Sequence, residues 1–155
     1  MGKLLIKNAT VINEGNRLNE DILIEGDLIT SISKKIQIDS DTQVIDAHGL
    51  ILIPGMIDDQ VHFREPGLTH KGNILSESKA AIAGGVTSYI EMPNTSPNTT
   101  TVDEFNKKIS IASINSYSNF SFMFGGTNDN LDEIKKINPT EVAGIKLFLG
   151  SSTGK

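Results

Sequence analysis

Past Pro54 the sequence alternates between short apolar stretches and helical patterns, and this alternation constrains the fold more than any other feature. The strand starts are roughly thirty residues apart, which is the unit length of an eightfold β/α barrel. Because helical patterns separate the strands, we expect the strands to be parallel. Residues 55–155 have room for four such units, so we predict an α/β fold with the first half of a (β/α)8 TIM-type barrel. The expected strands are "MIDDQVHF" (56–63), "GVTSYIEM" (85–92), "FSFMFGG" (120–126) and "VAGIKLFLG" (142–150).

Two of the intervening helices have recognisable starts. Thr101 and Asn130 are each followed three residues later by a glutamate, which is the spacing of a capping box. Gly84-Gly85 is interpreted as a helix stop. After the first of these starts, apolar residues recur at helical intervals, at Val102, Phe105, Ile109 and Ala112.

Residues 1–53 have a different sequence pattern, with short β segments and few stretches of helical periodicity. Gly26-Asp27 separates two apolar segments as a two-residue hairpin turn. We therefore predict a small antiparallel β unit over residues 1–53, followed by the barrel units over residues 54–155.

The composition excludes several classes of protein. With 37% hydrophobic and 21% charged residues, the chain is typical of a soluble globular protein. No apolar run approaches the roughly 18 residues of a membrane span, and the start lacks the features of a signal peptide, so a cytoplasmic protein is expected. The net charge of −5 comes without a basic stripe, which argues against a nucleic-acid partner. Without cysteine, any metal must be bound by His, Asp, Glu or modified Lys.

A polar cluster is expected where the first barrel strand ends. In "DDQVHFREPG" Gln60, His62 and Arg64 stand at every second position, so on a strand their side chains share one face with Asp58. A lone strand histidine is more often a hydrogen-bonded structural residue than a ligand. His62 has polar neighbours, however, and the loop after it lies at the strand end where barrel enzymes place their sites. We interpret this stretch as part of a ligand or metal site.

Lys146 lies in the apolar stretch "AGIKLFLG", which a barrel wall would bury. A buried ammonium is costly unless it is paired or neutralised. One interpretation is an ion pair with Asp58 or Asp59 across the barrel. In the other, the desolvated amine takes up carbon dioxide, and the resulting carbamate offers two oxygens to one or two metal ions.

Asn94 follows the second barrel strand, in "EMPNTSPNTT". An asparagine before a stretch rich in Ser and Pro is usually a turn former. It leaves the predicted barrel at the same end as Arg64, however, and an amide beside a guanidinium is a good receptor for a carboxylate. Three other features are interpreted as surface or structural: His48, His70 and the terminal "GSSTGK", an exposed loop that lacks the complete phosphate-loop pattern.

These motifs resemble the dihydroorotases of the amidohydrolase superfamily. The stretches "PGMIDDQVHFREPG", "AGGVTSYIEMPNTSPNTT" and "AGIKLFLGSSTG" occur in the family's order, and the resemblance covers the whole chain. The family has a metal-dependent barrel flanked by a β-sandwich made from both chain ends, so residues 1–53 would be part of that sandwich. Its members interconvert N-carbamoyl-aspartate and dihydroorotate in pyrimidine biosynthesis.

The resemblance also implies roles for individual residues. By the family motif D-x-H-x-H-x-R, His62 would be a metal ligand, and Arg64 would bind the substrate carboxylate together with Asn94. Lys146 matches the carboxylated lysine that bridges zinc ions. Gln60 replaces the first motif histidine, and an amide oxygen is a much poorer zinc ligand than an imidazole, so one metal position is weak or lost. Two further histidines and the catalytic aspartate come from later strands that this sequence does not contain.

The leading hypothesis is a dihydroorotase-like cyclic amide hydrolase that acts on a small molecule. We expect these 155 residues to be an inactive piece that needs the missing C-terminal half of the barrel. An allantoinase- or hydantoinase-type amidase is the nearest alternative, and Arg64 argues against it because a neutral hydantoin has no carboxylate. A non-catalytic homologue acting as a binding or structural subunit is a third hypothesis, which Gln60 favours. The sequence is also compatible with a protein that forms a homo-oligomer.

Overall fold

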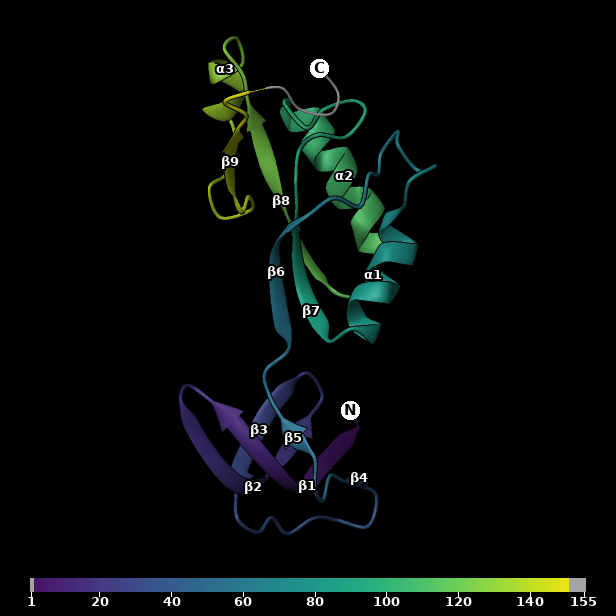
Figure 1. Cartoon of the computed structure of the whole chain (residues 1–155), viewed down its shortest axis with the longest axis vertical. Helices are drawn as coiled ribbons and strands as arrows, with labels where there is room; N and C mark the ends of the chain where they lie inside the picture. Colours follow the sequence, from purple (N-terminus) through teal and green to yellow (C-terminus); the bar gives the residue numbers. More distant parts are fainter. Residues whose placement is uncertain (1, 151–155) are drawn as a thin grey trace. The chain divides into compact units, whose positions relative to one another are not determined.

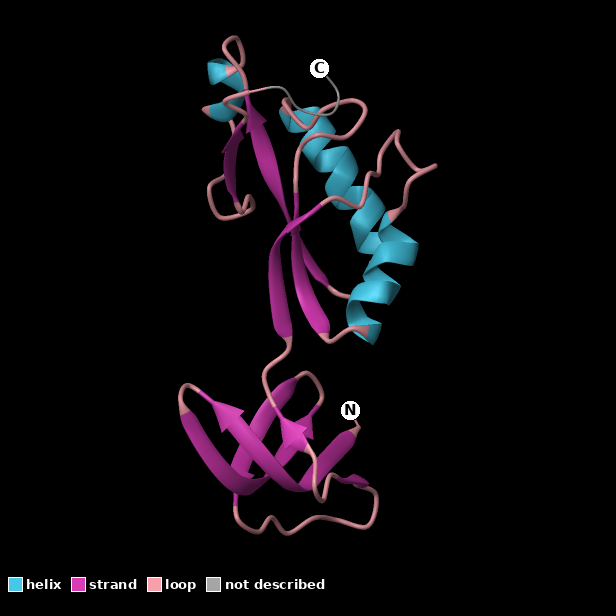
Figure 2. Cartoon of the chain, viewed as in Figure 1, coloured by secondary structure: helices cyan, strands magenta, loops and turns pink. Residues whose placement is uncertain are grey.

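A computed structural model of the chain describes residues 2–150. The chain divides into two compact units, Met1–Pro54 and Gly55–Lys155. The first consists of strands and loops, whereas strands and helices alternate in the second (Figures 1 and 2). Among the described residues, no helix is long and apolar enough to cross a membrane.

The first unit is built on a five-stranded sheet with the order β3-β2-β1-β4, in which β5 also pairs with β1. As predicted, Gly26 and Asp27 connect β2 to β3 as a two-residue turn, because Glu25 pairs with Leu28. Gly26 has a φ of 62°, which such tight hairpin turns require. The strands are β1 (Lys3–Asn13), β2 (Asn16–Glu25), β3 (Leu28–Ser33), β4 (Gln43–Asp46) and β5 (Ile51–Leu52).

One prediction for this unit is wrong, because the sheet is not wholly antiparallel. Strands β4 and β5 run parallel to β1. The β2–β3 hairpin and the segment after it form the long connection that a parallel neighbour needs. Side chains alternate every second residue in both kinds of strand, so the sequence pattern does not distinguish their direction.

The second unit contains four parallel strands in the order β6-β7-β8-β9. Each successive pair of strands is connected through a helix, and Figure 2 shows α1 and α2 on the same face of the sheet. The predicted parallel half-barrel is confirmed. Its elements are β6 (Met56–Val61), α1 (Ile74–Ala83), β7 (Val86–Glu91), α2 (Val102–Asn115), β8 (Asn119–Gly126), α3 (Leu131–Ile134) and β9 (Gly144–Leu147).

The core of the second unit is largely aromatic. Phe105 of α2 packs edge-on against Phe122 of β8, with ring centroids 6.4 Å apart. Phe105 and Ala112 are both buried, as the helical spacing of α2 predicts. The buried cluster comprises Phe63, Ile74, Tyr89, Phe105, Ala112, Phe122 and Phe124.

The two predicted helix starts have different outcomes. Thr101 caps α2, because its hydroxyl accepts the Glu104 backbone N–H at 3.2 Å. Asn130 makes no side-chain cap to α3, which has only four residues. Its amide donates instead to the carbonyls of Thr100 and Gly125, at 2.8 Å each. Asn130 therefore ties the loop before α3 to β8 and to the loop before α2.

Helix α1 has the most complete cap. The Asn73 side chain accepts the Ser76 backbone N–H at 2.8 Å, and the Ser76 hydroxyl lies 3.4 Å from the Asn73 backbone nitrogen. The capping-box pattern has glutamate or glutamine in the third helical position, so it does not predict a cap made by serine. Gly84 ends the helix, in agreement with the prediction.

Candidate active site

The predicted polar cluster lies where β6 ends, but it is not the regular strand face that the spacing indicates. Strand β6 ends at Val61, and its pairing with β7 shifts register between Asp58 and Val61. Arg64 has a φ of 73°, a left-handed conformation that is uncommon for residues other than glycine. The loop after β6 therefore presents His62 and Arg64. The predicted strand face is therefore wrong for His62 and Arg64. Nothing in the sequence indicates this, because its polar residues keep alternating through the register shift and the positive φ.

His62 and Asn94 form the closest side-chain contact of the cluster. His62 Nδ1 and Asn94 Oδ1 are 2.9 Å apart, and Asn94 is only 6% exposed. Because the amide oxygen is the acceptor, His62 Nδ1 carries the proton and its Nε2 keeps a free lone pair. Burial lowers the pKa of His62, and the nearby charge of Arg64 lowers it further. The neutral imidazole is the form that binds a metal.

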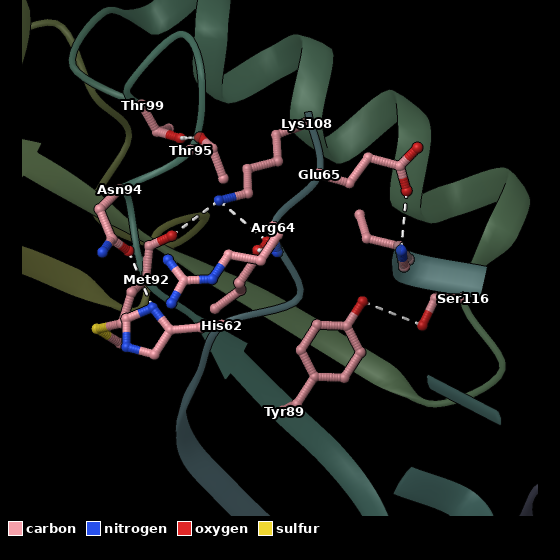
Figure 3. Close-up of polar contacts among 12 residues, drawn as sticks. His62, Arg64, Glu65, Tyr89, Met92, Asn94, Thr95, Thr99, Lys108 and Ser116 are labelled. Atoms are coloured by element: carbon pink, nitrogen blue, oxygen red, sulfur yellow. Dashed lines mark hydrogen bonds and ion pairs between the residues drawn. The ribbon is translucent and has the colours of Figure 1, made fainter. Parts of the chain in front are cut away.

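The guanidinium of Arg64 extends toward the His62 ring, as Figure 3 shows. Its Nη1 atom is buried and has no hydrogen-bond partner within residues 2–150. A buried donor without a partner is costly, and a carboxylate is the acceptor that fits a guanidinium best. Figure 3 shows Arg64 and Asn94 on either side of the His62 ring, and within residues 2–150 the arginine has an unused donor.

Lys146 lies on β9 and Gln60 on β6, which are the two outer strands of the four-stranded sheet. Lys146 Nζ on β9 lies 3.4 Å from Gln60 Oε1 on β6, so the curl of the sheet brings these side chains together. The predicted burial of Lys146 is wrong for the described part of the chain, where it is half-buried. Within residues 2–150, β9 pairs only with β8, and Leu147 beside Lys146 is 61% exposed.

The predicted alternative for Lys146, an ion pair with Asp58 or Asp59, does not occur among the described residues. Asp58 Oδ1 instead accepts the backbone N–H of Gln60 at 3.1 Å, which makes it a local support of the strand. Within residues 2–150, the ammonium of Lys146 therefore faces the amide oxygen of Gln60 and no carboxylate.

The donor atoms at this end of the sheet fit part of a metal coordination shell. His62 Nε2 is a suitable donor, and a carboxylated Lys146 would be another. Gln60 Oε1 is a neutral oxygen and a weaker zinc ligand. Across residues 2–150, no three His, Cys, Asp or Glu side chains are grouped as a metal site. A four-coordinate zinc ion would therefore need ligands in addition to these.

Sequence reasoning missed a buried ion pair beside the cluster. Lys108 Nζ on α2 lies 3.0 Å from Glu91 Oε2 at the end of β7, with the two side chains 0% and 1% exposed. Burial lowers the pKa of Lys108 and raises that of Glu91, and the charge of each partner opposes the shift. The sequence does contain a signal, since Lys108 falls on the apolar face of α2, between Phe105 and Ala112.

Features interpreted as structural lie outside this cluster. His48 and His70 are both exposed, as predicted. Residues 151–155 of the stretch "GSSTGK" lie outside the described residues.

Comparisons with known proteins agree with the predicted resemblance. The dihydroorotase of Methanosarcina acetivorans is 37% identical over 155 residues, which cover 99% of this chain and 33% of that protein. The dihydroorotase of Carboxydothermus hydrogenoformans is 50% identical over 96 residues, covering 61% of this chain and 22% of that protein. The chain is a homologue of the dihydroorotases. It spans about a third or less of the length of these curated relatives. No protein-family model matches the chain.

Solved structures place this dihydroorotase homologue in the amidohydrolase superfamily. The L-hydantoinase (dihydropyrimidinase) of Arthrobacter aurescens has a TM-score of 0.87 and is 32% identical, covering 94% of this chain and 32% of that chain. A D-hydantoinase (dihydropyrimidinase) from Thermus sp. has a TM-score of 0.75 and is 34% identical, covering 86% of this chain and 30% of that chain. Together these relatives support a cyclic amidohydrolase.

Proposed function

We propose that the protein is a metal-dependent cyclic amidohydrolase that interconverts N-carbamoyl-L-aspartate and dihydroorotate in de novo pyrimidine biosynthesis. The observation that carries this proposal is the buried Nη1 of Arg64, which has no partner among the described residues and lies beside the His62–Asn94 pair. A receptor for a carboxylate and a histidine with a free nitrogen then lie at the same strand ends. Dihydroorotate has both a carboxylate and a cyclic amide, so it matches both.

The carboxylate distinguishes this substrate from that of the hydantoinase structures. A neutral hydantoin or dihydropyrimidine ring would leave the Arg64 guanidinium unpaired in a partly buried place, which costs free energy. Dihydroorotate or N-carbamoyl-aspartate would pair with it in a charge-assisted contact. We therefore assign Arg64 to substrate choice as well as to affinity.

Asn94 has two roles in the proposed site. Its Oδ1 accepts from His62 Nδ1 at 2.9 Å, which holds the ring in one tautomer. Its Nδ2 is a second hydrogen-bonding group, and we propose that it donates to the substrate carboxylate together with Arg64. One side chain thus fixes the distance between the carboxylate end and the metal end of the site.

We propose that His62 Nε2 and a carboxylated Lys146 hold one or two zinc ions, with Gln60 as a weak ligand. When bound, the metal supplies polarisation of the ring carbonyl and activation of water. By its resemblance to the dihydroorotases, the protein takes its remaining ligands and its acid–base aspartate from outside these residues. The protein's own contribution here is to orient the ring between Arg64 and Lys146.

The full-length protein tests this proposal. We expect metal-dependent turnover of dihydroorotate and of N-carbamoyl-aspartate, with metal content measured on the same preparation by elemental analysis. Hydantoin serves as the control substrate, and we expect it to react much more slowly. A protein with a full metal complement and no turnover of either pyrimidine intermediate would support the non-catalytic homologue instead.

Replacing Gln60 with histidine is expected to tighten the weaker metal site by at least about tenfold, because an imidazole binds zinc better than an amide oxygen. The measurement is zinc affinity by competition with a chelator in the full-length protein. Gln43→His is the matched control, since Gln43 is an exposed glutamine on β4. Two tightly bound zinc ions in the unmodified protein, one of them on Gln60, would contradict a weakened site.

A further inference from the structure

We propose that the buried Glu91–Lys108 ion pair positions Arg64 and thereby sets the preference for a substrate that carries a carboxylate. This inference rests on the proposed function, because it requires Arg64 to bind the substrate. Neither Glu91 nor Lys108 is assigned any contact with substrate, so both are positioning residues.

The two carboxylate oxygens of Glu91 contact different neighbours. Oε1 accepts the backbone N–H of Arg64 at 2.9 Å, and Oε2 lies 3.0 Å from Lys108 Nζ. Both side chains of the pair are enclosed, with at most 1% exposed. Glu91 is therefore a direct link between α2 and the backbone that carries the Arg64 side chain.

The backbone of Arg64 needs such a link. Its φ of 73° lies in a region that residues with a side chain rarely adopt, and such conformations persist only where their surroundings hold them. The carbonyl of Arg64 accepts the Leu68 N–H at 3.0 Å. The next side chain, Glu65, accepts the Ile74 N–H at 2.8 Å through Oε2. Glu91 supplies the third contact, to the N–H of Arg64 itself.

Lys108 holds Glu91 in place and supports the other half of the carboxylate site. Its Nζ also donates to the Met92 carbonyl at 3.0 Å, as the dashed lines in Figure 3 mark. Met92 directly follows β7 and stands two residues before Asn94. One buried ammonium thus contacts the side chain that holds Arg64 and the backbone that leads to Asn94.

The proposed role predicts an effect on one kind of ligand. Dihydroorotate has a carboxylate that would bind the Arg64 guanidinium. Dihydrouracil is the same ring without the carboxylate, so it does not depend on Arg64. Loss of the contact to the Arg64 N–H should therefore weaken the use of dihydroorotate and leave dihydrouracil binding unchanged. A pair that only stabilised the fold would affect both ligands equally.

Two double variants of the full-length protein isolate this contact. Both Glu91→Gln/Lys108→Met and Glu91→Met/Lys108→Met remove the two charges and keep similar side-chain lengths. Only the glutamine retains an oxygen for the Arg64 N–H. We expect the methionine version to have a kcat/KM for dihydroorotate about 10- to 100-fold below that of the glutamine version. The inhibition constant of dihydrouracil should be the same in both.

Equal kcat/KM values for the two double variants, or equal losses for the two ligands, would overturn the inference. Arg64→Met separates this outcome from failure of the proposed function. If Arg64→Met has no effect, the proposed function fails; if it lowers turnover while the double variants match each other, only the positioning role fails.

If a double variant does not fold, amide hydrogen exchange in the unmodified full-length protein tests whether the Arg64 N–H is held by Glu91. We expect the Arg64 amide to exchange as slowly as the buried amide of Tyr89. Exchange at the rate of a solvated loop amide would overturn the positioning role.

Discussion

Replacing Arg64 with methionine is expected to lower kcat/KM for dihydroorotate by about 30- to 1000-fold in the full-length protein. The substitution removes a charge-assisted contact to the carboxylate worth roughly 2 to 4 kcal/mol. Methionine retains an unbranched side chain of similar length, so the packing around it changes little. It also removes the buried Nη1 that has no partner in the described part of the chain, so the free energy of unfolding should not decrease.

The control for this experiment is Arg17→Met, the chain's other arginine, which lies exposed on β2. Its kcat/KM should equal that of the unmodified protein. Unchanged kinetics for Arg64→Met with dihydroorotate would mean that the guanidinium does not bind the substrate carboxylate.

Replacing Lys108 with methionine is expected to lower the free energy of unfolding by about 3 to 5 kcal/mol, because it leaves the Glu91 carboxylate buried without its counter-charge. Neither side chain of the pair is more than 1% exposed, so water cannot replace the lost partner without opening the core. The measurement is denaturant unfolding of the full-length protein, if its transition is cooperative. Glu91→Gln/Lys108→Met should recover most of the loss, since it removes both charges.

Lys107→Met is the matched control on the same helix. Lys107 pairs with Glu104 at 2.9 Å, but its side chain is 65% exposed, so its loss should change the unfolding curve little. Equal effects of the two substitutions would contradict the importance of burial at Lys108.

The sequence was sufficient to predict the barrel units because their signal is periodic. The apolar stretches that became β6, β7, β8 and β9 are bounded by helical patterns, and only parallel strands fit such alternation. The first unit lacked that signal. Strands β4 and β5 pair parallel to β1, and nothing in a two-residue period distinguishes this from an antiparallel pairing.

The sequence predicted that the candidate side chains lie at neighbouring strand ends, but it did not predict their geometry, and their roles in a site stay predictions. Residue type and spacing identified His62, Arg64, Asn94 and Lys146, whereas the left-handed backbone of Arg64 has no counterpart in the alternation. The contact from Glu91 to the Arg64 N–H joins residues 27 positions apart in the sequence. Such a contact depends on how β6, β7 and α2 pack, which local patterns do not encode. Lys108 was detectable in principle as a charge on an apolar helix face.

A crystal structure of the full-length protein with dihydroorotate bound tests the central claim most directly. We predict that the carboxylate of the ligand accepts hydrogen bonds from the Arg64 guanidinium and the Asn94 amide, with its ring amide facing His62 and a carboxylated Lys146. A ligand whose carboxylate points away from Arg64, beside a Lys146 that remains a bare ammonium, would contradict the account.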